Sequence, residues 1–139
     1  MRRRAALAGI ATLPAALLAA CSATDPLGTQ LAAQPVHVVF FEDDSVALGA
    51  SALTVVQDAA NIARRYPAAP IRVLGYVAPE PDHAPIMALA RARAEHVAAE
   101  LVRFGVPRAR IMVSGRGAAP FAVDAPIEAR RVEIHIGPG

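Results

Sequence analysis

Between residues 36 and 136 the sequence alternates short β-branched or aromatic runs with two longer segments of helical periodicity. Apolar residues at every second position are typical of half-buried strands, whereas apolar residues spaced three and four apart indicate a helix. Proline and glycine residues separate these segments. The pattern predicts strands over residues 36–41, 71–76, 111–114 and 131–136, helices over residues 49–65 and 85–104, and a loop over residues 77–84.

The order strand, helix, strand, helix, strand, strand leaves few possible architectures. Helices that alternate with strands bury their apolar faces against a sheet. The last predicted strand carries Val132, Ile134 and Ile136 at alternate positions, with charged or polar residues between them. This alternation indicates a sheet with one buried face and one solvated face. The sequence therefore predicts an α+β domain with two helices covering one side of a sheet.

One charged side chain lies within the apolar stripe of the second predicted helix. At about 100° per residue, Arg93 shares the face formed by Ile86, Ala90, Val97, Leu101 and Phe104. A guanidinium cannot lose its charge, so on a buried face it must meet an acceptor or an incoming anion. The acceptor could be internal, such as the carboxylate of Asp124 or strand-end carbonyls. It could also be a ligand, and the residues alone leave both alternatives open.

The first 20 residues have the features of a cleaved export signal. Three arginines, residues 2–4, precede an apolar run over residues 5–18, which is too short for a membrane-spanning helix. The tetrapeptide Leu18–Cys21 resembles the bacterial lipobox, in which the cysteine is lipidated and the signal is cut just before it. This resemblance implies a lipid anchor on Cys21, and Ser22 behind it favours the outer membrane. Residues 22–35, with little periodicity, are expected to be a linker, followed by one domain over residues 36–137.

Charge and cysteine content exclude several classes of function. The pI near 9.3 suggests nucleic-acid binding, but removal of the signal leaves 11 basic and 12 acidic residues. A phosphate-binding surface needs clustered positive charge, so we expect no nucleic-acid partner. Cys21 is the only cysteine, so neither a disulfide within the chain nor a cysteine-based metal cluster can form.

Seven short motifs, in order and at matching distances, resemble the OmpA-like peptidoglycan-binding family. They begin with Val39–Phe41 and an acidic turn, continue through a strand ending in Gly75, and include Leu89–Val97, which matches the family's Leu-Ser-x-x-Arg-Ala-x-x-Val. The closing Asn-Arg-Arg-Val-Glu-Ile corresponds to Ala129–Ile134. The resemblance covers residues 36–136 and implies a βαβαββ sandwich with two helices on one face of a four-stranded mixed sheet.

The resemblance also implies non-covalent binding of the diaminopimelate residue in the peptidoglycan stem peptide. Arg93 matches the family arginine that binds carboxylate. The family's Gly-His-Thr-Asp reads Gly75–Ala78 here, so a methyl group replaces the carboxylate that would bind the ammonium. Asp82 or Glu80 in the same loop could substitute for it, and Arg130 of the closing motif is a further candidate for wall binding.

The remaining chemistry gives no case for an enzyme. The four histidines lack metal-ligand spacing, and the glycines near residue 115 lack the rest of a dinucleotide fingerprint. We therefore expect no catalytic residue, no metal and no cofactor. The sequence predicts an outer-membrane lipoprotein that faces the periplasm and tethers the envelope to peptidoglycan through a partly degenerate site. The alternative is a non-binding scaffold of the same fold, an interaction subunit with other envelope proteins as partners.

Overall fold

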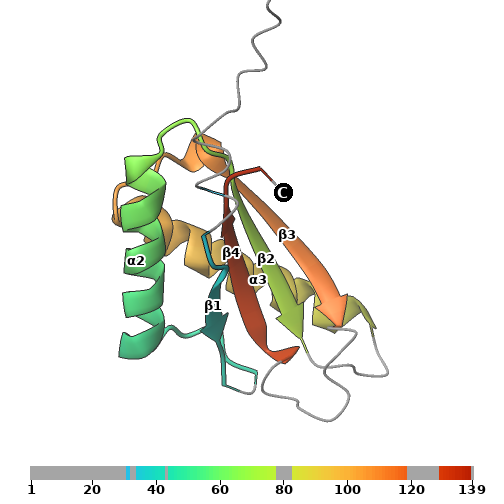
Figure 1. The fold of residues 1–139 in the computed structure, drawn as a ribbon. Coiled ribbons are helices and arrows are strands. Elements are labelled where there is room, and N and C mark those ends of the chain that lie inside the picture. Colours follow the sequence, from blue (N-terminus) through green and yellow to red (C-terminus); the bar gives the residue numbers. More distant parts are fainter. Residues whose placement is uncertain (1–30, 32–33, 43, 78–82, 119–128, 139) are drawn as a thin grey trace, which may run out of the picture.

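The computed structural model describes residues 31, 34–42, 44–77, 83–118 and 129–138 (Figure 1). The predicted signal, Cys21, Ala78, Glu80, Asp82 and Asp124 lie outside these residues. The described elements follow the expected order: β1 (His37–Phe40), α2 (Ala50–Arg65), β2 (Ile71–Val77), α3 (His83–Arg103), the 3₁₀ turn η1 (Arg108–Arg110), β3 (Ile111–Ala118) and β4 (Arg131–Ile136).

The strands form one mixed sheet in the spatial order β1-β4-β2-β3. β4 runs antiparallel to both β1 and β2, whereas β2 and β3 are parallel. Both helices pack on the same face of this sheet, as Figure 1 shows, and the described residues leave the other face open. The predicted α+β class, with two helices on one face of a four-stranded mixed sheet, is confirmed.

The core lies between the sheet and the two helices. Alternate residues of each strand face the helices, so the predicted pattern of β4 is confirmed with Val132 and Ile134 fully buried. The helices contribute mostly small side chains, which lets them approach the strands closely. The central buried residues are Val39, Val56, Ala60, Ala63, Ile71, Val73, Ala94, Val97, Leu101, Val132 and Ile134.

Two glycines that face each other in the sheet set the distance between α3 and the strands. Gly75 of β2 pairs in register with Gly115 of β3. A Cβ on Gly75 would lie 2.0 Å from the carbonyl oxygen of Ala90, and one on Gly115 would lie 3.2 Å from that of Met87. Because neither glycine has a side chain, the backbone of α3 can rest directly on these strands.

The end of α3 has the hydrogen-bond pattern of a Schellman motif. Gly105 adopts φ +94°, a left-handed conformation that favours glycine. Its amide donates to Val102 O, and the amide of Val106 donates to Leu101 O, both at 3.0 Å. Gly105 thus provides the C-terminal cap of α3.

Two boundaries differ by more than one residue from the expectation based on the sequence. β3 continues to Ala118 rather than ending at Ser114, because it pairs with β2 through Gly115 and Gly117, with an irregularity where Arg116 has no opposite residue. Glycine disfavours strands in general, so the sequence pattern ended the strand too early. α3 begins at His83, two residues before the expected start.

The pairing defines two opposite ends of the domain. At one end β1, β2 and β3 begin, β4 finishes, and Leu31 lies buried against Gly137. We call this the linker end, because the chain enters the described part there; it is the upper end in Figure 1. At the other end β2 and β3 finish and α3 begins. We call this the loop end.

Candidate functional site

Arg93 is completely buried, as its place in the apolar stripe of α3 predicted. Its guanidinium reaches the connection between β1 and α2 and donates two hydrogen bonds to backbone carbonyls there. Nε donates to Ser45 O at 2.8 Å and Nη2 donates to Glu42 O at 2.9 Å. The charge therefore has internal acceptors, which burial of a guanidinium requires.

Phe41 supplies an aromatic surface to the same guanidinium. The Arg93 Cζ atom lies 5.2 Å from the centroid of the Phe41 ring, within the range of a cation–π contact. The amide of Phe41 in turn donates to Arg130 O at 2.9 Å, which joins the end of β1 to the start of β4. The Arg93 side chain and the backbone of Arg130 thus both contact Phe41 at the loop end.

The β1–α2 connection is held in shape mainly by α3. Besides the two bonds from Arg93, the Nδ1 atom of His96 forms a hydrogen bond with Val46 O. The hydroxyl of Ser45 accepts from the amide of Ala47 at 3.0 Å. Asp44 adopts φ +49°, a left-handed conformation that aspartate tolerates better than most residues. Arg93 and His96, one turn apart on α3, thus fix a loop that follows the edge strand.

These contacts bear on the alternatives left open for Arg93. The internal alternative required an acceptor within the domain, and two backbone carbonyls of the β1–α2 connection provide it. Asp124, the carboxylate considered in that alternative, lies outside the described residues, as do Ala78, Glu80 and Asp82. In the sequence Ala78 directly follows Val77, which is the last residue of β2.

The side chain of Arg110 forms a set of hydrogen bonds that the sequence did not reveal. Its Nη2 donates to the carbonyls of Ala63, Tyr66 and Ala69 at 3.0, 2.7 and 2.9 Å, and its Nε donates to Ala69 O at 3.2 Å. The last carbonyls of a helix lack intrahelical partners, so this arginine caps α2 from a distant segment. Burial lowers the pKa of Arg110 from its ordinary value, although the group stays charged.

A second cluster lies on the open face of the sheet. Glu133 accepts from Arg131 Nε at 2.8 Å and pairs with His135 Nε2 at 3.0 Å. The Arg131 guanidinium also lies over the ring of Tyr76, 5.2 Å from its centroid. Burial favours the neutral carboxyl, but the hydrogen bonds from His135 and Arg131 outweigh it and hold the pKa of Glu133 below its ordinary value.

Within the described part of the chain, no group of three or more His, Cys, Asp or Glu side chains is arranged to hold a metal ion. No helix among these residues has the length and apolar character needed to cross a membrane.

The fold and this loop end define a class: small α+β domains in which a helix-borne arginine is buried against the edge of a mixed sheet. Comparison with known proteins makes the class specific. The model of the OmpA family matches residues 40–134. The chain belongs to the OmpA family, which confirms the resemblance found in its motifs.

One curated relative is the probable lipoprotein YiaD of Escherichia coli strain K12. It is 32% identical over 105 residues, which are 72% of this chain and 48% of YiaD. The chain thus spans about half the length of this relative.

Solved structures share the fold. The peptidoglycan-associated lipoprotein from Burkholderia pseudomallei has a TM-score of 0.66 and 22% identity, over 72% of this chain and 89% of that one. The C-terminal domain of Helicobacter pylori MotB has a TM-score of 0.65 and 25% identity, over 73% of this chain and 84% of that one.

Proposed function

We propose that this chain is an outer-membrane lipoprotein, anchored through a lipidated Cys21 and facing the periplasm, whose OmpA-like domain binds peptidoglycan non-covalently. The names of two relatives, a probable lipoprotein and a peptidoglycan-associated lipoprotein, support this reading of the envelope location. The lipobox-like Leu18–Cys21 supports the anchor. The partner would be the diaminopimelate residue of the stem peptide, and the proposed role is binding without catalysis or a cofactor.

The observation that carries the proposal is the positively charged guanidinium of Arg93, which is held in one orientation at the loop end. Arg93 occupies the position of the family's carboxylate-binding arginine, and its guanidinium is oriented by Glu42 O, Ser45 O and the Phe41 ring. A guanidinium held in one orientation loses little conformational entropy when a carboxylate approaches it. We assign it the anion side of the proposed site, with Arg130, joined through Phe41, as a second and weaker candidate.

The part of the proposed site that would bind the ammonium group of the ligand is weakened. Ala78 stands where the family has an aspartate, so an ammonium group loses a charge-assisted contact. Such a contact contributes about 1.5–3 kcal/mol, or one to two decades of affinity. Asp82 remains the candidate to replace it from the same loop, with Glu80 beside it. We therefore propose weak rather than tight wall binding.

A second function has a specific observation in its favour. Arg93 is completely buried and its donors meet backbone carbonyls, which is also what a purely structural arginine would do. Together with Ala78, this supports a domain that keeps the fold and serves as an interaction subunit with other envelope proteins.

Co-sedimentation with purified wall sacculi tests the first function against the second. The domain is prepared from Ser22 onward, which retains every described helix and strand, since all of them lie within residues 37–136. We expect weak retention, strengthened by Ala78→Asp and abolished by Arg93→Ala. Arg91→Ala, an exposed arginine on the same helix, is the matched control and should leave retention unchanged.

Unchanged retention in both Ala78→Asp and Arg93→Ala would refute the proposed pocket. Loss of stability in Arg93→Ala without any change in retention would favour the scaffold. For the anchor, mass measurement of the membrane fraction should detect acylated Cys21, and Cys21→Ala should release the chain from the membrane.

A further inference from the structure

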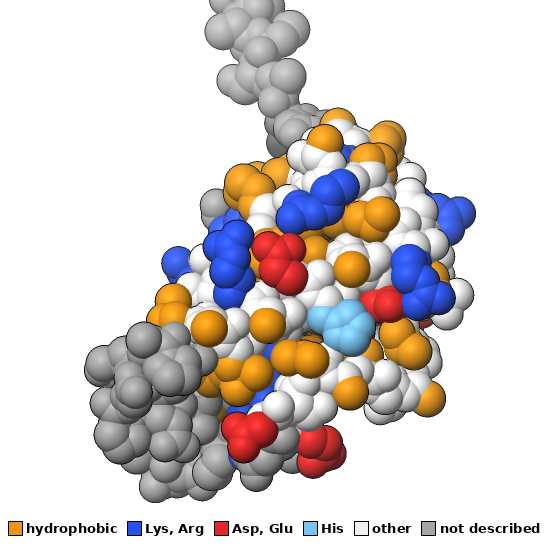
Figure 2. All heavy atoms as spheres, turned by 180° about the vertical axis from the view of Figure 1, so that it is seen from behind, with side chains coloured by type: hydrophobic (Ala, Val, Ile, Leu, Met, Phe, Trp, Pro, Cys, Tyr) orange, Lys and Arg blue, Asp and Glu red, His pale blue; other side chains and the backbone are white. Residues whose placement is uncertain are grey.

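Arginines gather at the linker end of the domain. Arg64 and Arg65 end α2, Arg103 ends α3, Arg108 begins the 3₁₀ turn, and Arg72 is the second residue of β2. All five side chains are exposed or half-exposed, and we call this group the basic end. In Figure 2 the blue side chains lie mainly on the upper part of the helical face, with acidic side chains among them, and further acidic side chains lie at its lower margin.

The positive charge of the basic end is only partly neutralised. Arg103 pairs with Glu100 at 2.8 Å and Arg108 pairs with Glu95 at 3.3 Å. Among the described residues, no carboxylate forms an ion pair with Arg64, Arg65 or Arg72. Arg110, close by, is occupied with the carbonyls that follow α2 and is not counted in this group. The linker end therefore carries a surplus of positive charge.

The opposite end has a different balance. Glu42 and Asp44 are exposed there. In the sequence, the segments that follow β2 and β3, residues 78–82 and 119–128, contain four carboxylates and no arginine. The described residues of the loop end also include an arginine, Arg116 near the end of β3, so this end is mixed rather than purely acidic.

The chain enters the domain at the basic end. Leu31 is buried at the linker end, so only residues 22–30 separate the domain from Cys21. At about 3.3 Å per residue, this segment spans at most roughly 30 Å. If Cys21 carries the lipid anchor proposed above, the basic end is the part of the domain held nearest to the bilayer.

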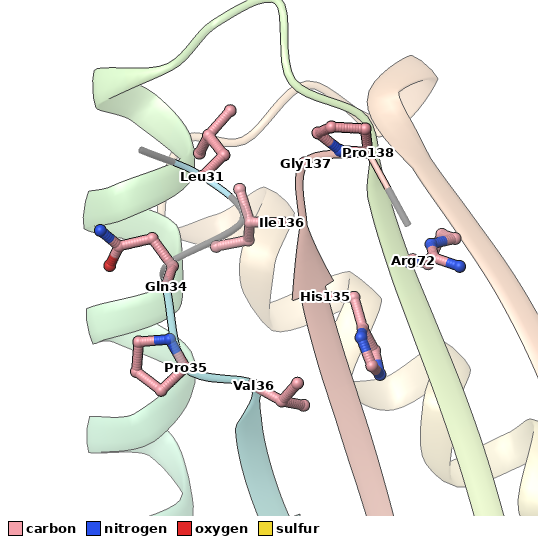
Figure 3. Close-up of a pocket in the computed structure, with 9 residues that line it drawn as sticks. All are labelled: Leu31, Gln34, Pro35, Val36, Arg72, His135, Ile136, Gly137 and Pro138. Atoms are coloured by element: carbon pink, nitrogen blue, oxygen red, sulfur yellow. The ribbon is translucent and has the colours of Figure 1, made fainter. Parts of the chain in front are cut away.

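A shallow hollow of about 150 Å³ opens at the same end (Figure 3). The residues on either side of it come from the incoming chain, Leu31 and Gln34–Val36, and from the end of β4. Arg72 and His135, paired in register on β2 and β4, also line it. Arg72 thus lines a recess that an anionic group can enter.

We propose that the basic end docks on the anionic phospholipid headgroups of the membrane that holds Cys21. An arginine near an anionic membrane surface strengthens binding roughly fivefold, and a short tether keeps the local lipid concentration high. Docking would turn the loop end, with Arg93, away from the bilayer and toward the wall. The biological setting rests on the proposed anchor, but the docking surface is a property of the domain itself.

A structural role for some of these arginines is the competing explanation. Arg64, Arg65 and Arg103 lie in the last turns of α2 and α3, where cations interact favourably with the helix macrodipole. This role does not extend to Arg72, which lies in a strand. It predicts lower thermal stability on substitution and no change in lipid binding.

Vesicle co-sedimentation of the domain from Ser22 onward, without lipid on the protein, tests the proposal. We expect binding to vesicles of phosphatidylcholine mixed with phosphatidylglycerol, no binding to phosphatidylcholine alone, and loss of binding at high salt. Arg64→Gln combined with Arg65→Gln should lower the partition coefficient roughly 25-fold. Arg91→Gln combined with Arg116→Gln removes the same charge from residues outside the basic end and should leave binding unchanged.

Equal losses in the two double variants would overturn the proposal, because net charge alone would then explain binding. Absence of binding to the anionic vesicles would also overturn it, as would a lower melting temperature of the first double variant with unchanged binding. The wall-binding proposal is measured separately on sacculi, so either proposal can fail while the other stands.

Discussion

The guanidinium of Arg93 lies over the ring of Phe41, and this contact connects the middle of α3 to the end of the edge strand β1. Phe41 is itself buried, and its amide is bonded to Arg130 O. Three segments that are far apart in the sequence therefore meet around one charged side chain. Substitution of Arg93 should therefore affect the stability of the fold as well as the proposed wall binding.

Arg93→Ala should lower the free energy of unfolding by about 3 kcal/mol, because it removes the donors to two carbonyls and leaves a cavity beside Phe41. Arg93→Lys should recover only part of this, since an ammonium cannot reproduce the planar fork. Urea unfolding followed by circular dichroism measures both. Arg91→Ala, on the exposed side of α3, should change stability by less than about 0.5 kcal/mol. A loss in Arg93→Ala no larger than in this control would contradict the structural importance of the contact.

Gly75→Ala should destabilise the domain far more than Gly115→Ala. A methyl group on Gly75 would meet the Ala90 carbonyl at 2.0 Å, so β2 and α3 would have to separate. We expect a loss of about 3 kcal/mol there and about 1 kcal/mol at Gly115, where the nearest atom is at 3.2 Å. Gly49→Ala serves as the control, because no atom lies within 4 Å of its added methyl group. Thermal melts of the three variants should rank in that order, and equal losses at Gly75 and Gly49 would refute the close approach.

Much of the fold was predictable because its main determinants are local. The period of the apolar residues distinguishes strands from helices, and the prolines after Arg65 and the glycine at position 105 mark where the helices end. The burial of Arg93 was predictable for the same reason, since its neighbours at helical spacing are apolar. The extension of β3 through Gly115 and Gly117 was not, because it depends on pairing with β2 and on contact with α3.

The partners of the arginines could not be predicted. Arg93 and Arg110 both donate to backbone carbonyls. Because every residue has a backbone carbonyl, the residue types do not indicate which carbonyls will accept these bonds. Only the folded chain determines which carbonyls lack an intrahelical or sheet partner. The assignment of Arg93 to a ligand came from the family motif, whereas its contacts with Glu42 and Ser45 required the structure.

Arg110→Ala should lower the free energy of unfolding by about 2–3 kcal/mol. The substitution leaves the carbonyls of Ala63, Tyr66 and Ala69 without their shared donor, at a place where α2 turns toward β2. Arg108→Ala is the control, since Arg108 is a neighbouring arginine whose side chain is half-exposed. Hydrogen exchange should show faster exchange in the last turn of α2 for Arg110→Ala alone. Uniform acceleration over the whole domain in both variants would argue against a local cap.

Acid should weaken the domain partly through Glu133. Although burial opposes its ionisation, hydrogen bonds from His135 and Arg131 hold the pKa of this carboxyl below its ordinary value. A carboxyl whose pKa is lower in the folded state stabilises the fold while it is ionised. This contribution is complete above the unfolded pKa, near 4.5, and is lost as the pH falls through the folded pKa.

Glu133→Gln should therefore be less stable than the parent at pH 7, by about 2 kcal/mol, and the difference should shrink as the pH falls below 4.5. Glu95→Gln removes an exposed partner of Arg91 and Arg108 and should cost less than about 1 kcal/mol at pH 7. Urea midpoints of the three proteins between pH 7 and pH 3 measure these differences, and a constant gap between the parent and Glu133→Gln over that range would show that Glu133 does not titrate as its contacts require.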